Sequence, residues 1–131
     1  MTLAEYFTTR KGIGVLATAD ADGHVDAAVY SRPHFMEDGT LAFIMRNRLT
    51  HDNLNSNPHA TYLFIEEGNG YKGKRLFLRK VREEKESERL YELRRRSYPS
   101  DKNPEEDPKF LVFFELERTL PLLGDGENPS Q

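Results

Sequence analysis

The chain of 131 residues contains no cysteine. This absence excludes disulfide bonds, thiol nucleophiles, iron–sulfur clusters and cysteine-ligated zinc, and it is typical of proteins in the reducing cytosol. The first twelve residues lack the apolar run of a secretion signal, and no apolar run approaches the length of a membrane span. We therefore expect a soluble, cytoplasmic protein that does not associate with membranes.

Three common catalytic motifs are also missing: the G-x-S-x-G elbow, the Walker phosphate loop and the zinc-protease helix motif. No metal site is predicted, because no tight metal-ligand spacing on one helix links the four histidines, which are His24, His34, His51 and His59. Two of them, His34 and His51, remain candidates for contacts with a substrate or an anion.

Length and charge point to one small domain. The chain suits a single domain, 1–131, with one hydrophobic core and a frayed tail over 121–131. The net charge of −3 implies no particular partner. Basic residues outnumber acidic ones between 72 and 96, which we interpret as an exposed strand and helix face, so we predict no nucleic-acid partner.

Apolar runs separated by turn signals predict six strands. Two lie within 14–36 and are joined by a hairpin turn at 20–23, and the others cover 40–46, 60–66, 74–82 and 109–120. Helices are predicted at the N-terminus, from a capping box at Thr2 and Glu5 with Gly12 ending the turn, and at 83–97, before a proline-bounded acidic loop at 98–108. Such short connections favour a mainly β fold, a small antiparallel β-barrel with a few short helices.

The last strand contains "FLVFF" at 110–114, which is apolar at five successive positions. This pattern indicates a strand covered on both faces. One face would line the barrel interior, and the other requires a helix or a second subunit.

The polar segment 46–60, "RNRLTHDNLNSNPHA", lies between two strongly apolar runs. It predicts a short helix with Thr50 as N-cap and Asn53 at the third helical position, ending before Asn57-Pro58. A helix N-terminus favours an anion such as phosphate, and Arg46 and Arg48 would add charge. From the residues alone, a phosphate site and a capped connecting helix remain as alternatives.

The second strand carries "VYSR" at 29–32, which can present an aromatic ring and polar groups beside the third strand. The combined surface suits a flat aromatic ligand with a phosphate at one end. In order, "GVLATAD", "DG", "VDAAVYSRPHF" and "EDGTLAFIMRNRLTHDNLNSNPHATYLF" resemble the pyridoxamine 5'-phosphate oxidase-like family of FMN-binding split barrels. The resemblance covers nearly the whole chain in layout and Val15 to Phe64 in motif.

The resemblance implies a six-stranded antiparallel split β-barrel and a homodimer that holds two FMN molecules in clefts between subunits. It also implies nine cofactor-binding residues. Positions beside the isoalloxazine ring correspond to Val29, Tyr30 and Ser31. Positions near the ring and ribityl chain correspond to Met45 and Arg46, and the phosphate segment corresponds to Arg48, Leu49, Thr50 and Asn53.

The sequence departs from the family pattern at two positions. Ala28 replaces a strand-two arginine and Thr50 replaces a lysine that opens the helix, so the phosphate charge would fall to Arg46 and Arg48, with Arg32 as a further candidate. The chain is also shorter than pyridoxamine-phosphate oxidases and lacks their extra C-terminal substrate segment. We therefore do not expect vitamin B6 oxidation.

The resemblance implies a flavin-dependent oxidoreductase acting on an unknown small substrate. The flavin carries the redox chemistry while the protein binds, orients and tunes it, so no catalytic residue is assigned. Two alternatives remain: a non-catalytic flavin or haem protein acting in binding or electron transfer, and a deazaflavin-dependent reductase.

Overall fold

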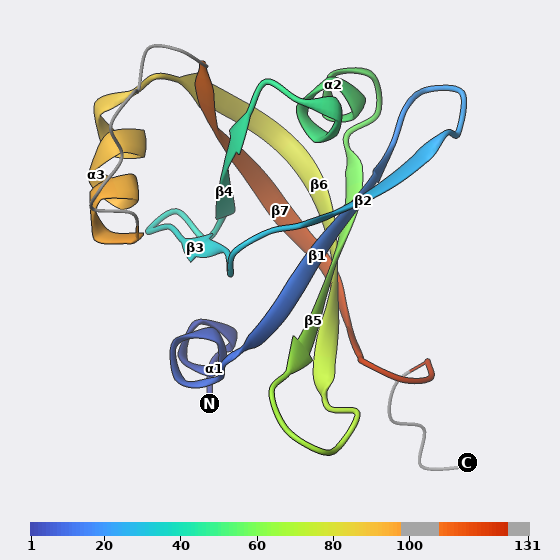
Figure 1. Ribbon diagram of the computed structural model, residues 1–131. Coiled ribbons are helices and arrows are strands. Elements are labelled where there is room, and N and C mark those ends of the chain that lie inside the picture. The colour runs from blue at the N-terminus through green and yellow to red at the C-terminus, as the bar shows by residue number, and fades with distance from the viewer. Residues whose placement is uncertain (98–107, 126–131) are drawn as a thin grey trace.

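The computed structural model describes residues 1–97 and 108–125, in which seven strands form one antiparallel sheet (Figure 1). The sheet order is β2-β1-β5-β6-β7-β4-β3. The strands are β1 (Gly12–Ala19), β2 (Val25–Val29), β3 (His34–Phe35), β4 (Leu41–Arg46), β5 (His59–Glu66), β6 (Gly73–Lys85) and β7 (Lys109–Pro121). The helices within the same residues are α1 (Leu3–Thr9), α2 (Leu49–Ser56) and α3 (Glu88–Ser97).

The sheet is curled but not closed, as expected of a split barrel. Its two edge strands, β2 and β3, follow one another in sequence, yet β2 pairs with β1 and β3 pairs with β4. The predicted count of six strands was wrong by one, because β3 has only two residues and is too short to show an alternating pattern. The predicted hairpin turn is confirmed, with Gly23 at a φ of +86°.

Both faces of the 110–114 segment in β7 are covered, as predicted. Phe110, Val112 and Phe114 belong to the main core inside the barrel. On the outer face, Leu111 and Phe113 pack against α3 in a second cluster. The cover on the outer face is therefore a helix of the same chain, and this strand gives no support to a subunit interface.

α1 begins at the predicted capping box, in which the Thr2 side chain accepts from the Glu5 N–H and the Glu5 carboxylate accepts from the Thr2 N–H. The helix ends at Thr9, so the prediction that Gly12 ends it was wrong, and Gly12 instead begins β1. No helix among the described residues combines the length and apolar character that a membrane crossing requires.

α2 starts two residues earlier than predicted. Its N-cap is Arg48 rather than Thr50, and no described side chain caps it. Thr50 is the second helical residue, with its hydroxyl 3.4 Å from the Asp26 carboxylate on β2, and Asn53 is the fifth rather than the third. The local sequence predicts that the Thr50 hydroxyl caps the helix, but in the structure this hydroxyl contacts the tertiary partner Asp26 instead. The helix ends at Ser56, with Asn57 as its C-cap, so the predicted end before Asn57-Pro58 is confirmed.

The third helix is shorter than the predicted 83–97, because β6 continues to Lys85 and α3 begins at Glu88. Residues 83–85 pair with residues 110–112 of β7, and this pairing overrides the local helix signal. The Ser87 hydroxyl accepts from the Leu90 N–H and so caps the helix. The predicted acidic loop falls mostly on residues 98–107, and the end of the predicted tail on 126–131, which lie outside the described residues.

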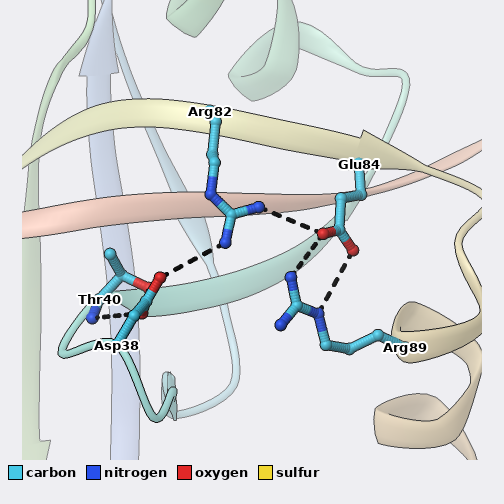
Figure 2. Close-up of polar contacts among 5 residues, drawn as sticks. All are labelled: Asp38, Thr40, Arg82, Glu84 and Arg89. Atoms are coloured by element: carbon cyan, nitrogen blue, oxygen red, sulfur yellow. Dashed lines mark hydrogen bonds and ion pairs between the residues drawn. The ribbon is translucent and has the colours of Figure 1, made fainter.

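An ion-pair network fastens α3 to the sheet (Figure 2). Glu84 on β6 accepts from Arg89 of α3 and from Arg82, and Arg82 in turn reaches Asp38 in the turn between β3 and β4, at 3.5 Å. The Arg82 and Arg89 guanidinium groups also lie over the Phe113 ring, at 3.7 and 4.9 Å from its centre. These contacts fix α3 beside β4, and they show that part of the basic stretch 72–96 is engaged in surface ion pairs.

Candidate functional site

A broad groove of about 1390 Å³ lies at the opening of the barrel. Its walls come from β2 and the residues that follow it, from the free end of β4 and from the start of α2, with further contributions from α1, β3 and α3. β3 pairs with β4 only at Leu41 and Ala42, so residues 43–46 form an edge that faces this opening. The groove therefore occupies the split between the two ends of the sheet.

Eight of the nine predicted binding residues line this groove. They come from three segments of the chain and are Val29, Tyr30, Ser31, Met45, Arg46, Arg48, Leu49 and Thr50. Asn53 instead is buried behind α2, where its side-chain amide donates to the Thr18 hydroxyl at 3.0 Å. Asn53 thus fastens α2 to β1, while the roles of the other eight in binding stay predictions.

The segment Tyr30–Ser31 is held from below by Tyr62 of β5. The Tyr62 hydroxyl donates to the Ser31 carbonyl at 3.1 Å and lies 3.3 Å from the Tyr30 carbonyl. The Tyr30 ring packs edge-on against Phe43 of β4, with ring centres 6.1 Å apart, and both residues line the groove. Burial raises the pKa of the Tyr30 phenol, with the Asp26 charge adding to this and a hydrogen bond with Thr50 opposing it, so the phenol keeps its proton.

The groove is rich in cations. Arg46 and Arg48 lie at its α2 end, and Arg94 reaches it from α3. Arg32 also lines it, but its guanidinium donates to the Phe7 and Arg10 carbonyls at 2.8 and 2.7 Å. Arg32 therefore caps the C-terminal end of α1. Because its guanidinium already makes these two hydrogen bonds, Arg32 is a weaker candidate for a phosphate ligand than Arg46 and Arg48.

The histidines have different surroundings. His34 lines the groove, whereas His51 is buried beneath α2. His24 lies with Asp20 and Asp22 in the β1–β2 turn, close enough for a shared ion. Asp20, however, accepts from the backbone N–H groups of Asp22 and His24, and the His24 hydrogen bond holds the pKa of that carboxyl below its usual range. These contacts account for the cluster as the frame of a tight turn.

Comparison with known proteins identifies the family to which this architecture belongs. The model of the pyridoxamine 5'-phosphate oxidase family matches residues 3–118. The chain belongs to this family. The family match includes every described residue that lines the groove.

Several solved structures share the fold. An FMN-binding protein from Syntrophomonas wolfei subsp. wolfei superposes with a TM-score of 0.71 at 20% identity, covering 90% of this chain and 82% of the other. An F420 reductase gives 0.71 at 18%, covering 88% and 94%. HutZ, the haem storage protein from Vibrio cholerae, gives 0.62 at 18%, covering 90% of each. No curated protein matches the chain significantly. At these identities the likeness establishes the fold alone.

Sequence reasoning missed part of the groove of this oxidase-family chain. Asp26, among the described lining residues the one carboxylate, occupies the same face of β2 as Ala28, and alternation along the strand was a signal that could have identified it. Leu93 and Arg94 line the groove only because α3 docks beside β4. No local pattern indicates that contact.

Proposed function

We propose that the chain binds FMN in this groove. The phosphate would lie at Arg46, Arg48 and Thr50, and the ring would lie against Val29–Ser31 and Met45. The observation that carries the proposal is the convergence of residues from β2, β4 and the start of α2 on one groove at the barrel opening. The membership of the chain in the pyridoxamine 5'-phosphate oxidase family supports the same cofactor.

The chemistry of the groove fits this cofactor. The α2 N-cap uses no described side chain, so the first-turn N–H groups can meet an anion, and two guanidinium groups precede them. Buried Phe43 and Met45 provide an apolar wall for a flat ring. One feature opposes a dianion: the Asp26 carboxylate near Thr50. The three cations at Arg46, Arg48 and Arg94 outnumber it.

We infer that the function is a flavin-dependent oxidation or reduction of a small molecule, in the cytosol. Bound FMN would supply hydride and electron transfer. The chain would bind and orient the cofactor, with Tyr30 held by Tyr62 as a protonated hydrogen-bond donor in the groove wall. The cysteine-free composition suits a reducing compartment.

A second copy of the chain is the partner we propose for the outer face of β1 and β2. Val25 and Val29 are 83% and 76% exposed, Ile13 is 61% exposed, and the pairing of Val15 with Val29 places these strands side by side. Val29 also lines the groove, so a subunit covering this face would complete the site. Val25→Glu should give a monomer by sedimentation, whereas Tyr71→Glu, in the exposed β5–β6 loop, should leave the dimer intact.

Deazaflavin and haem are the alternative ligands, as the F420 reductase and HutZ share the fold. His34 favours the haem alternative, because a histidine lining the groove is a possible axial ligand. The absorption spectrum of the purified protein separates the three. Flavin bands with FMN released on denaturation support the proposal, whereas a Soret band or a released deazaflavin replaces it with one of the alternatives.

The phosphate assignment is tested by replacing Arg46 and Arg48 together with Gln. The expected loss of FMN affinity is about 3–6 kcal/mol, because each of the two charge-assisted hydrogen bonds contributes about 1.5–3 kcal/mol. Riboflavin, which lacks the phosphate, should bind the double variant and the wild type equally. Arg118→Gln, on β7 away from the groove, is the matched control. Equal losses for FMN and riboflavin would refute the assignment.

A further inference from the structure

His51 follows directly after the groove-lining residues of α2, but its side chain has the opposite orientation. It is only 4% exposed, and its ring stacks on Phe110 of β7 with centres 3.8 Å apart. Packing alone would be served by any flat apolar ring. The two ring nitrogens therefore require a separate explanation, because buried polar groups are costly unless they are hydrogen-bonded.

Each ring nitrogen meets an oxygen on a different element. Nδ1 lies 3.3 Å from Oδ1 of Asn47, which stands between Arg46 and Arg48. Nε2 lies 3.0 Å from Oε1 of Glu83 on β6. His51 thus connects the junction between β4 and α2, which carries the two arginines, to β6, a strand in the interior of the sheet order.

A second contact closes the connection between α2 and β6. Lys80 donates to Glu83 at 2.7 Å and to Asn55 of α2 at 3.2 Å. Partial burial raises the pKa of the Glu83 carboxyl, but the hydrogen bonds from Lys80 and His51 outweigh it, so the net pKa lies below the usual range. Glu83 therefore stays charged near neutral pH and holds its two partners.

The start of α2 needs such an anchor. Capping side chains normally order a first turn, and here the N-cap residue Arg48 has an extended backbone and no described capping side chain. The arrangement leaves the first-turn N–H groups available to a ligand. It also leaves the turn dependent on contacts from its buried side.

We propose that His51 is a positioning residue, which through Asn47 and Glu83 holds the arginine-bearing start of α2 in its binding geometry. The proposal rests on the proposed function for its ligand, since the segment it holds is the one assigned to the FMN phosphate. The structural link itself is independent of any ligand.

The test compares His51→Phe, which keeps the ring on Phe110 and removes both polar contacts, with His51→Gln, whose amide can still donate to Glu83. Amide hydrogen exchange in the ligand-free protein reads the link directly. In His51→Phe the Asp52 N–H, which bonds the Arg48 carbonyl at 3.0 Å, should exchange about tenfold faster. The Asn57 N–H, at the other end of α2, should change little, and His51→Gln should restore most of the protection.

Binding measurements then read the consequence for the ligand. His51→Phe should weaken FMN binding about tenfold and leave riboflavin binding unchanged. Glu83→Met also removes the partner of Lys80, so it should weaken FMN binding at least as much. The double variant should lose little more than Glu83→Met alone, because both changes break the link between His51 and Glu83. His59→Phe, at an exposed histidine on β5, is the matched control.

The outcomes separate the two proposals. A wild-type protein that binds no FMN would overturn the proposed function, while exchange at Asp52 would still decide the role of His51. Unchanged exchange at Asp52 in His51→Phe would overturn the positioning role. Faster exchange with equal losses of FMN and riboflavin, or with additive effects of His51→Phe and Glu83→Met, would overturn it as well.

Discussion

Gly14 should be among the least replaceable residues of the chain. A Cβ at this position would lie 1.9 Å from the Tyr62 hydroxyl oxygen and 2.4 Å from the ring carbon that bears it. Ordinary contact begins near 3.4 Å, so the ring would have to shift by about 1.5 Å. Tyr62 is fully buried among Phe7, Phe43 and Phe64, which leaves it no room to do so without displacing them.

The magnitude follows from two contributions. Forcing extra volume into a packed core costs about 1–3 kcal/mol. Burial raises the pKa of the Tyr62 phenol, so its hydroxyl is a donor, and losing its hydrogen bond to the Tyr30–Ser31 carbonyls costs a further ~1 kcal/mol. Gly14→Ala should therefore lower the free energy of unfolding by about 2–4 kcal/mol.

Urea denaturation of Gly14→Ala, Tyr62→Phe and the double variant measures this, with equal m-values as the check on two-state unfolding. Tyr62→Phe alone should cost about 1 kcal/mol. The double variant should be no less stable than Gly14→Ala, because the ring carbon still clashes and the hydrogen bond is already lost. A Gly14→Ala protein within about 0.5 kcal/mol of the wild type would refute the reasoning, since surface substitutions produce changes of that size.

Two further predictions concern the end of β6. The folded state lowers the pKa of the Glu83 carboxyl, so the contribution of Glu83 to stability is present above the ordinary value of 4.5 and is lost as the pH falls through the lower folded value. The free energies of unfolding of wild type and Glu83→Gln should therefore differ at neutral pH and converge in acid. A difference that stays constant with pH would contradict this. Glu86 has a φ of +51°, and its carboxylate accepts from the Lys109 N–H and the Tyr91 hydroxyl. Glu86→Gly and Glu86→Ala both lose these contacts, but only glycine relaxes the left-handed backbone, so Glu86→Gly should be the more stable by about 1 kcal/mol in urea denaturation.

Most of the architecture could be predicted from the sequence, because apolar runs and turn residues mark the strands. The 110–114 run predicted a strand covered on both faces, and the structure confirms it. The errors fall where a tertiary contact overrides a local preference. The Thr50 hydroxyl contacts Asp26 instead of capping α2, and residues 83–85 extend β6 because they pair with residues 110–112 of β7.

The groove shows the same division between local and tertiary information. Residues on β2, β4 and the start of α2 were selected by motif, and eight of the nine lie together. Asn53 lies on the same helix face as Thr50 but one turn further along α2. It therefore contacts Thr18, the β1 partner of Asp26, rather than lining the groove. The contributions of Leu93 and Arg94 depend on the docking of a separate helix.

The position of that helix follows from β6 rather than from its own sequence. Because β6 runs on to Lys85, α3 begins beyond the edge of the barrel and returns along the outer face of β4, where Leu90 is buried against Leu111. The network of Arg82, Glu84 and Arg89 then joins the end of strand β6 to the first turn of α3 (Figure 2). The same strand carries Glu83, which is bonded to His51 beneath α2. The end of β6 therefore holds both α3 and α2, the two helices that form the groove walls on either side of the free edge of β4. A shift of β6 would move both helices together.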